Sequence, residues 1–370
     1  MDWAFLLPST FKMPYTWYSF GVEMEFIVKF RIDDFIPEEN RGCAHLIQYP
    51  DLMRTVYRRI VTFMRDHGFM VHNYPPHCVN LSYWKVKIPP PNVQVDGFDI
   101  IRDEWGFCPV KLVAPVMSFT GRSFHTIQEA LNSLTGGFDI LTNNSCSLNV
   151  HVGSIIGDRD GKIEGHDLQS IGFRLTALEN LLALVWMYQK QLNAIHPSSR
   201  VNEAHVFTPS ALLSHLNPRI VKQRILDCTS TQALCQLWDG SKARYHHPQG
   251  IMAYSIEGMV AHSTAGGAMI ESGNRTVRFG QHRGTVDPSE IQHWVILVGR
   301  LVELADEIVP WCWPLSIALR RSKNLPVKLC EISTVQLLEG IKVPVQARFY
   351  ARRLHTHETG VNASVAGSGL

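Results

Sequence analysis

The stretch FGVEMEF, from Phe20 to Phe26, places two carboxylates one residue apart inside an apolar run. Alternate side chains of a β-strand point to the same face, so Val22 and Met24 lie on one side. Glu23 and Glu25 then share the other side, about 7 Å apart at Cα. Like charges at this distance repel unless a metal ion, a Lys or Arg side chain, or a cationic substrate lies between them. The stretch therefore predicts either a strand with two solvated acids or a strand that lines a functional site.

The composition is that of an ordinary globular protein. The chain has 370 residues, of which 45% are hydrophobic and 18% are charged, which is enough to bury one large core or two smaller ones. The formal net charge is +2, and the Lys and Arg residues are scattered rather than clustered. This charge pattern gives no reason to expect a nucleic-acid partner, and we expect a small-molecule substrate instead.

Eight cysteines without a CxxC pair indicate buried thiols in a reducing compartment rather than a disulfide scaffold. The first residues, MDWAFLLPSTFK, have too short an apolar run for a signal peptide, and no stretch approaches about 18 uninterrupted apolar residues. We therefore expect a cytoplasmic protein without a membrane partner. No long exposed apolar segment is obvious, which favours a monomer or dimer.

Predicted strands and helices mix without the regular alternation of a doubly wound sheet. Apolar spacing predicts strands over about 18–32, 108–117, 146–153 and 275–283, the second broken at Pro115. It predicts helices over 51–68, 124–134, 166–196 and 288–309, with Asp287 as the N-cap of the last. These elements favour the α+β class around a largely antiparallel sheet. No linker or repeat divides the chain, so we expect one domain over 1–355 and a flexible tail over 356–370.

Three segments taken together resemble the fungal amidoligases. FGVEMEF, LNVHVG followed by a long apolar helix, and TVRFGQHRGTVDPSEI followed by another long helix have the order and spacing of that family. The resemblance covers about residues 18 to 310. Fungal amidoligases are carboxylate-amine ligases related to glutamine synthetase.

The resemblance implies a curved, glutamine-synthetase-like antiparallel sheet whose concave face holds ATP and divalent metals. ATP phosphorylates a carboxylate and an amine then displaces the phosphate to leave an amide, while Mg²⁺ neutralises the phosphate charge. By this resemblance Glu23 and Glu25 are the two acids of the first strand, one for each metal. His151 matches the second residue of the family's His-x-His strand. The expected activity is ligation of a small metabolite, by analogy in secondary metabolism.

The other ligand positions depart from the family pattern. Lys111 stands where the family has an acid, and Asn149 replaces the first residue of His-x-His. The family pattern Glu-Phe-Arg-Gln-His reads RFGQH over 278–282 and is followed by Arg283, so the metal-binding acid and the phosphate-binding Arg are both missing. Lys111 and Arg278 would repel a divalent ion from this face. They can instead pair with the two acids, so a metal-free pocket is the simplest interpretation.

The candidate site residues fall into three groups. The catalytic candidates are Glu23, Glu25, His151 and His282. Candidates for binding substrate or phosphate are Lys111, Asn149, Arg200, Arg278 and Gln281. If a metal is retained, we expect its ligands to be Glu23, Glu25 and His151.

The assignments of His282 and Arg200 depend on strand alternation and on the family resemblance. Strand alternation places His282, rather than Gln281, on the face of Arg278. Arg200 matches a family Arg that would hold a carboxylate or phosphate bidentately, and its alternative is an exposed position at a helix end.

Three functions remain open from the sequence. The first is a carboxylate-amine ligase that uses ATP and Mg²⁺ with an altered metal site. The second is an enzyme on the same scaffold without ATP or metal, which catalyses a cyclisation, elimination or other acid-base step. The third is a non-catalytic binding protein. The position of the Arg278 side chain discriminates among them, because a ligase needs it turned away from the phosphates.

Overall fold

The alternation in FGVEMEF is realised in β1 (Tyr18–Arg31), the longest strand of the sheet. Val22, Met24 and Phe26 are completely buried, and they belong to one large hydrophobic core. β1 is extended over 14 residues and pairs with β7 on one side and with β4 on the other. The strand that FGVEMEF predicts is therefore a central strand of the sheet.

The computed structural model describes residues 18–34, 49–72, 82–89, 93, 101–102, 104–154, 172–202, 206–208, 217–240, 251–260, 262–263, 269–270, 275–307 and 332–354. After β1, the strands are β2 (Lys85–Lys87), β3 (Ile101–Arg102), β4 (Trp105–Val113), β5 (Met117–Ser118), β6 (Asp139–Leu141), β7 (Ser147–Ser154), β8 (Val206–Phe207), β9 (Ile251–Met252), β10 (Tyr254–Ser255), β11 (His262–Ser263), β12 (Met269–Ile270) and β13 (Thr276–Arg283).

The α-helices are α1 (Tyr49–Asp66), α2 (Gly121–Gly137), α3 (Leu175–Met187), α4 (Gln189–Asn193), α5 (Ser199–Asn202), α7 (Pro218–Leu226), α8 (Thr231–Trp238), α9 (Pro288–Glu307) and α11 (Thr334–Gly340). A further helix covers residues 344–354. Two short 3-10 helices are η3 (Ile32–Asp34) and η6 (Glu257–Met259).

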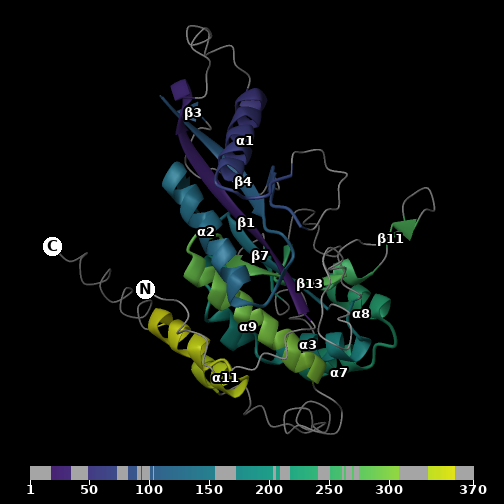
Figure 1. Cartoon of the computed structure of the whole chain (residues 1–370). Helices are drawn as coiled ribbons and strands as arrows, with labels where there is room; N and C mark the ends of the chain where they lie inside the picture. The colour runs from purple at the N-terminus through teal and green to yellow at the C-terminus, as the bar shows by residue number, and fades with distance from the viewer. Residues whose placement is uncertain are drawn as a thin grey trace, which may run out of the picture.

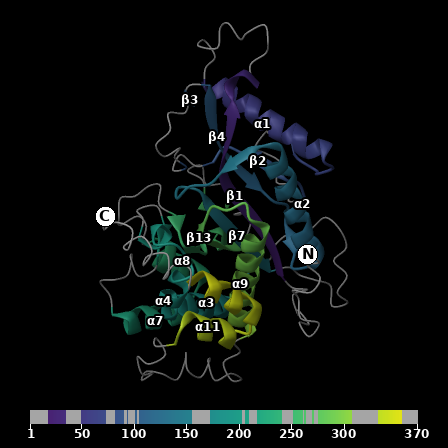
Figure 2. The same ribbon diagram turned by 90° about the vertical axis from the view of Figure 1, so that its left-hand side faces the viewer.

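Within the described residues, nine strands form the main sheet. Its order is β10-β13-β7-β1-β4-β2, with β3 paired to β4 and with β5 and β6 paired to β1. Every pairing in this sheet is antiparallel. Helices α1, α2 and α9 run along one side of the sheet (Figures 1 and 2). The predicted α+β class, with a curved and largely antiparallel sheet packed against long helices, is confirmed.

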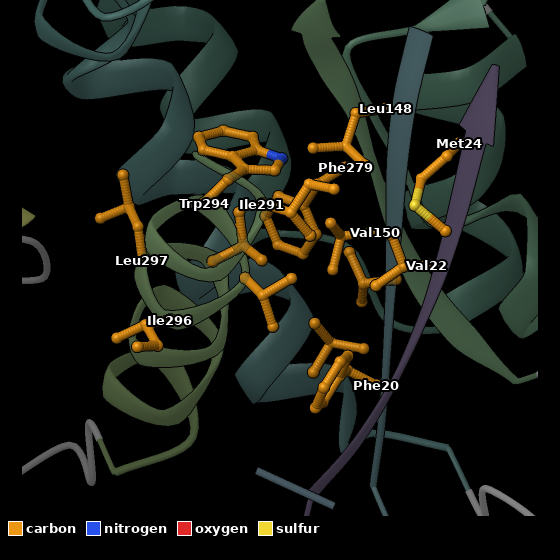
Figure 3. Packing of buried hydrophobic residues seen from close by; sticks show 14 of the residues in the cluster. Phe20, Val22, Met24, Leu148, Val150, Phe279, Ile291, Trp294, Ile296 and Leu297 are labelled. Carbon is orange, nitrogen blue, oxygen red and sulfur yellow. The ribbon is translucent and has the colours of Figure 1, made fainter. Parts of the chain in front are cut away.

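The core lies between the sheet and α9. Figure 3 shows Leu148 and Val150 of β7 and Phe279 of β13 pointing toward Ile291 and Trp294 of α9. All five side chains are completely buried. Burial of this apolar row fixes which face of each strand is inside, because a one-residue slip in register would turn the whole row outward. The polar residues between them are therefore held on the opposite face.

The predicted helix over 166–196 is shorter and divided in the structure. Described residues form α3, then Tyr188 leaves helical geometry at φ −107° and ψ 19°, and α4 follows. Residues 178–185 of α3 are all buried, as expected for a helix that is apolar almost all round. The N-cap prediction is confirmed, since Asp287 Oδ1 accepts a hydrogen bond of 2.9 Å from the backbone N–H of Ser289.

No helix in the described ranges has the length and apolar character needed to cross a membrane. The single domain over 1–355 stays a prediction. The tail predicted over 356–370 lies outside the described residues.

Candidate functional site

The register of the sheet brings the polar residues of four strands together. Glu23 of β1 is paired with Asn149 of β7, and Glu25 is paired with Lys111 of β4. Residues directly opposite each other on neighbouring strands share a face. The next residue on the same face of β7 is His151, and it pairs with Arg278 of β13. We define the carboxylate cluster as these six residues: Glu23, Glu25, Lys111, Asn149, His151 and Arg278.

Glu23 is held as an ion. Lys111 Nζ lies 2.5 Å from its Oε2, and His151 Nε2 lies 3.8 Å from its Oε1. Burial opposes ionisation of this carboxyl, but the attraction of His151 and Lys111 outweighs burial and holds the pKa of Glu23 well below its usual range. Glu23 therefore keeps its negative charge at any pH at which the protein is expected to work.

Glu25 lies in a different environment, although it is only two residues away. Its side chain is fully buried. Its Oε2 accepts hydrogen bonds from Ser147, at 3.0 Å from the backbone N and 2.5 Å from Oγ. Lys111 Nζ is 3.9 Å from Oε1. Burial raises the pKa of Glu25, and the opposing effects of Ser147 and Lys111 do not cancel this rise. One strand thus carries one fixed carboxylate and one carboxyl that holds its proton more tightly.

These residues do not fit a divalent metal ion. The cation within reach of both acids is the Lys111 ammonium, which lies 2.5 Å from Glu23 Oε2 and 3.9 Å from Glu25 Oε1. A divalent ion bound to the same acids would face strong repulsion from this charge. In the described part of the chain, no group of three or more His, Cys, Asp or Glu side chains is arranged to hold a metal. The sequence prediction that Lys111 pairs with the acids agrees with this geometry.

Four buried polar atoms of the cluster have no hydrogen-bond partner among the described residues: Glu25 Oε1, Asn149 Oδ1, His151 Nε2 and Arg278 Nε. The side chains of Asn149 and His151 are also held by hydrogen-bond contacts at their other polar atom. Asn149 Nδ2 donates to Ser147 Oγ at 3.0 Å, and His151 Nδ1 lies 3.2 Å from Thr276 Oγ1. Buried polar groups in proteins are almost always paired. The cluster therefore has two acceptors and the Arg278 Nε without a hydrogen bond from the described residues, while His151 Nε2 lies 3.8 Å from Glu23 Oε1.

Arg278 was expected to pair with a carboxylate of the first strand. The structure does not show this pairing, since within the described residues Lys111 and His151 are the cationic side chains that approach Glu23. Arg278 is half-buried, and its Cα partner is His151 rather than an acid.

His282 does not share the face of Arg278, so the prediction from alternation is wrong. The register of β13 against β7 shifts between Phe279 and His282, and His282 pairs with Leu148. Leu148 points to the core (Figure 3). Three steps along β13, from Phe279 to His282, oppose two steps along β7, so β13 contains one extra residue. This extra residue reverses the alternation beyond it. His282 therefore lies inside the protein, where its ring is 5.4 Å from that of Trp294 and burial lowers its pKa to about 4.

On that inner side His282 belongs to a second charged group, which we call the Glu290 network: His282, Arg283, Thr285, Glu290 and Arg353. Glu290 Oε1 is ion-paired with Arg353 and lies 3.3 Å from Arg283 Nε, while Thr285 Oγ1 donates to Oε2 at 3.0 Å. Burial opposes ionisation of Glu290, but these partners outweigh it and lower its pKa to about 2. This carboxylate is fully used in joining the start of α9 to the helix over 344–354.

Gln281 and Arg200 are also absent from the carboxylate cluster. Gln281 is completely buried and lies between two polar partners, accepting from Tyr254 Oη at 2.5 Å and donating to Asn193 Oδ1 at 2.6 Å. Arg200 donates to the backbone carbonyl oxygens of Gly280 at 3.0 Å and Gln281 at 3.3 Å. Both side chains therefore contact the irregular part of β13 and lie outside the carboxylate cluster, so their role in substrate binding stays a prediction.

Sequence reasoning missed Ser147 and Thr276. Ser147 precedes Asn149 by two residues on β7, so alternation alone places it beside the other polar side chains of that face. Thr276 precedes Arg278 by two residues on β13 for the same reason. Both were overlooked because their hydroxyl groups matched no position of the family pattern.

Comparison with known proteins adds little to this geometry. No protein-family model matches the chain, and no curated protein matches it either. Among solved structures, the chain is similar to a bifunctional glutathione synthetase from Pasteurella multocida, with 12% sequence identity and a TM-score of 0.35. The match covers 93% of this chain and 47% of that one, so this chain spans about half its length. A TM-score this low carries no argument about fold or function.

Proposed function

We propose that the chain is an enzyme that moves a proton on a small molecule at the carboxylate cluster, in an elimination, cyclisation or similar acid-base step, without a divalent metal at Glu23 and Glu25. One observation carries the proposal: on one strand, Glu23 is ion-paired with Lys111 at 2.5 Å, whereas Glu25 is fully buried with no hydrogen bond from the described residues at Oε1, and their pKa values shift in opposite directions. Such a separation is how a single site supplies both a permanent charge and a group that exchanges a proton.

Each residue has a role that follows from its contacts. Glu25 is the proton-exchanging group, because its Oε1 is free of hydrogen bonds from the described residues. Lys111, 3.9 Å from that oxygen, stabilises the negative charge that forms when Glu25 releases its proton. Glu23 fixes the Lys111 ammonium by a contact of 2.5 Å. His151, oriented by Thr276, holds Nε2 3.8 Å from Glu23 Oε1 and so helps to keep that carboxylate ionised.

The resemblance to the amidoligases supports a second candidate, an ATP-dependent carboxylate-amine ligase acting on a small metabolite in secondary metabolism. The observation in its favour is that Glu23 and Glu25, the two acids that match the family pattern, share one face of β1 beside Lys111. Two observations count against it: Lys111 takes the place of a metal, and Arg200 is already bound to the backbone of β13. We therefore rank it second, and no step is assigned to ATP or Mg²⁺.

Activity screening separates the candidates. The purified protein is incubated with a small-molecule extract, either with a chelator and no nucleotide or with ATP and Mg²⁺, and consumed compounds are identified by mass spectrometry. Consumption in the presence of chelator, lost in Glu25→Gln and kept in the surface control Glu129→Gln, is the expected result. The Glu129 side chain is 56% exposed and therefore a matched control. Consumption only with ATP and Mg²⁺ would support the ligase, and no consumption in either arm would support a non-catalytic binding protein.

Calorimetric titration with ATP and Mg²⁺ gives an independent readout. The acid-base proposal predicts no heat of binding at millimolar nucleotide. Micromolar binding that a chelator abolishes would overturn it in favour of the ligase. The cytoplasmic location and the monomeric or dimeric state remain proposals alongside this function.

A further inference from the structure

We infer that the carboxylate cluster recognises a small acid that carries a hydrogen-bond donor at its other end, such as an amino acid or a hydroxy acid. Its anionic group, a carboxylate or a phosphate, is bound by Arg278, which stands beside His151 on the neighbouring strand. The donor is bound by Asn149 and Glu25. This inference rests on the proposed function for the identity of the site, and it adds the class of substrate.

The anion subsite is formed by one cross-strand pair. Arg278 and His151 are direct partners on β13 and β7, so their Cβ atoms are about 5 Å apart on one face of the sheet. Arg278 presents a buried Nε that has no hydrogen-bond partner in the described part of the chain, whereas His151 Nε2 lies 3.8 Å from Glu23 Oε1. A buried guanidinium nitrogen without an acceptor is costly, and an anionic oxygen removes that cost.

The charge of the cluster favours an anion. Glu23 and Lys111 form an ion pair and cancel each other. Arg278 then remains as a cation without a carboxylate partner among the described residues. Glu25 does not compensate for it, because it pairs across the strands with Lys111 and lies on the far side of β7 from Arg278. One negative charge on a ligand neutralises the surplus.

The acceptor end is separate from the anion subsite. Asn149 Oδ1 and Glu25 Oε1 are buried and accept no hydrogen bond from the described residues. Asn149 is two residues from His151 along β7, a separation of about 7 Å. A ligand that reaches both ends therefore has its donor several bonds away from its acidic group. A molecule with only an acid or only a donor satisfies half of the unpaired atoms.

Calorimetry with four simple probes tests this arrangement on the full chain. The probes are 4-aminobutyrate, which has both groups, butyrate and inorganic phosphate, which have only the anion, and butylamine, which has only the donor. We expect 4-aminobutyrate to bind at least about tenfold more tightly than any single-ended probe. If phosphate binds more tightly than butyrate, the natural anion is a phosphate, and the reverse order assigns a carboxylate.

Two variants and a control complete the test. Arg278→Met should weaken 4-aminobutyrate binding at least about tenfold, whereas Arg54→Met, at a side chain that is 69% exposed, should not change it. Asn149→Leu should reduce the advantage of 4-aminobutyrate over butyrate. Equal binding of 4-aminobutyrate to native protein and Arg278→Met would overturn the inference, as would failure of all four probes to bind the native protein at millimolar concentration.

The proposed function fails or survives separately. If Arg278→Met loses probe binding but Glu25→Gln keeps full turnover, the recognition of an acid stands and the acid-base role of Glu25 is wrong. If Glu25→Gln loses turnover but Arg278→Met binds the probes normally, the reverse holds. Circular dichroism and thermal unfolding of each variant show whether a loss of binding reflects a loss of fold.

Discussion

The sheet carries two charged groups on its two faces, and they differ in how completely their carboxylates are paired. Glu290 has partners at both oxygens, from Arg353, Arg283 and Thr285. Glu25, equally buried, has two hydrogen bonds at Oε2 and none from the described residues at Oε1. A carboxylate whose bonding capacity is used up stabilises the fold, whereas one with a free oxygen is available for a substrate.

The difference extends to their pKa values. The partners of Glu290 lower its pKa to about 2, while burial raises that of Glu25. The same residue type is therefore held ionised on the inner face and holds its proton more tightly on the outer face. Substitutions at the two positions should therefore separate stability from activity.

The largest effect is expected on turnover in Glu25→Gln. The amide keeps an oxygen that accepts from Ser147 but cannot exchange a proton, so the rate should fall about 10²- to 10⁴-fold. The free energy of unfolding should not fall at neutral pH, because the pKa of the buried Glu25 carboxyl is raised and its ionisation costs stability. Turnover is measured on the compound found in the screen, with Glu129→Gln as the control. A variant that keeps full activity would remove Glu25 from the mechanism.

The reciprocal result is expected in Glu290→Gln. Loss of this buried charge leaves Arg353 and Arg283 without their common partner, and the free energy of unfolding should fall by about 3 kcal/mol. Turnover per folded molecule should be unchanged, because Glu290 lies on the other face. Chemical denaturation measures the first quantity and the activity assay the second. An inactive variant of native stability would show that the two groups are coupled.

The pH dependence of stability should have opposite signs at these two acids. The folded-state pKa of Glu290 is lowered to about 2, so its contribution is present above the ordinary pKa of 4.5 and is lost as the pH falls toward 2. The pKa of Glu25 is raised, so its ionisation costs stability as the pH rises above 4.5. Denaturation of both Gln variants across acid and neutral pH checks this: Glu290→Gln should flatten the acid limb, whereas Glu25→Gln should gain stability relative to native protein as the pH rises.

The face on which each residue of β1 and β7 lies could be predicted from the sequence, because side chains of a strand alternate with a period of two. The apolar row of β1 and the alternation in β7 predict that Glu23, Glu25, Asn149 and His151 face away from the core, as the structure places them. The identity of the cation between the acids was also within reach, since Lys111 lies where the family has an acid. These features follow from strand geometry, which local sequence determines.

The irregularity in β13 was not predictable in the same way. It depends on contacts from distant segments: Gly280 N–H donates to Ala253 O at 2.8 Å, and Arg200 donates to the carbonyl of Gly280. Within residues 276–283 the only local signal of a bulge is Gly280, which lies at the shift. Strict alternation ignored this signal and assigned His282 to the wrong face. Tertiary contacts decided the orientation of this residue and removed it from the candidate site.

Arg200→Met tests whether that irregularity is supported as described. Loss of the hydrogen bonds to the carbonyls of Gly280 and Gln281 should reduce the free energy of unfolding by about 2 kcal/mol. Binding of 4-aminobutyrate should be unchanged, because Arg200 is not in the carboxylate cluster. Loss of probe binding in a variant that unfolds like the native protein would restore Arg200 as a ligand-binding residue.

The smallest effect is expected at the start of α9. Asp287→Ala removes the side chain that caps Ser289 N–H and should destabilise the protein by about 1 kcal/mol. Asp287→Asn retains a capping oxygen and serves as the matched control, with a much smaller loss. Thermal unfolding of both variants distinguishes capping from a charge effect. Similar losses in the two variants would indicate that the charge, rather than the hydrogen bond, is what matters.

The central claim, that two neighbouring carboxyls differ in charge and bind no divalent metal, is tested most directly by ¹³C NMR titration of the side-chain carboxyls. Glutamate-labelled protein is titrated with acid and with Mg²⁺, and the signals of Glu23 and Glu25 are assigned from their Gln variants. We predict that Glu25 titrates above the ordinary glutamate range, that Glu23 stays ionised well below it, and that Mg²⁺ shifts neither signal. Titration of both groups near the ordinary value of 4.5, or a Mg²⁺-dependent shift of both, would contradict the account.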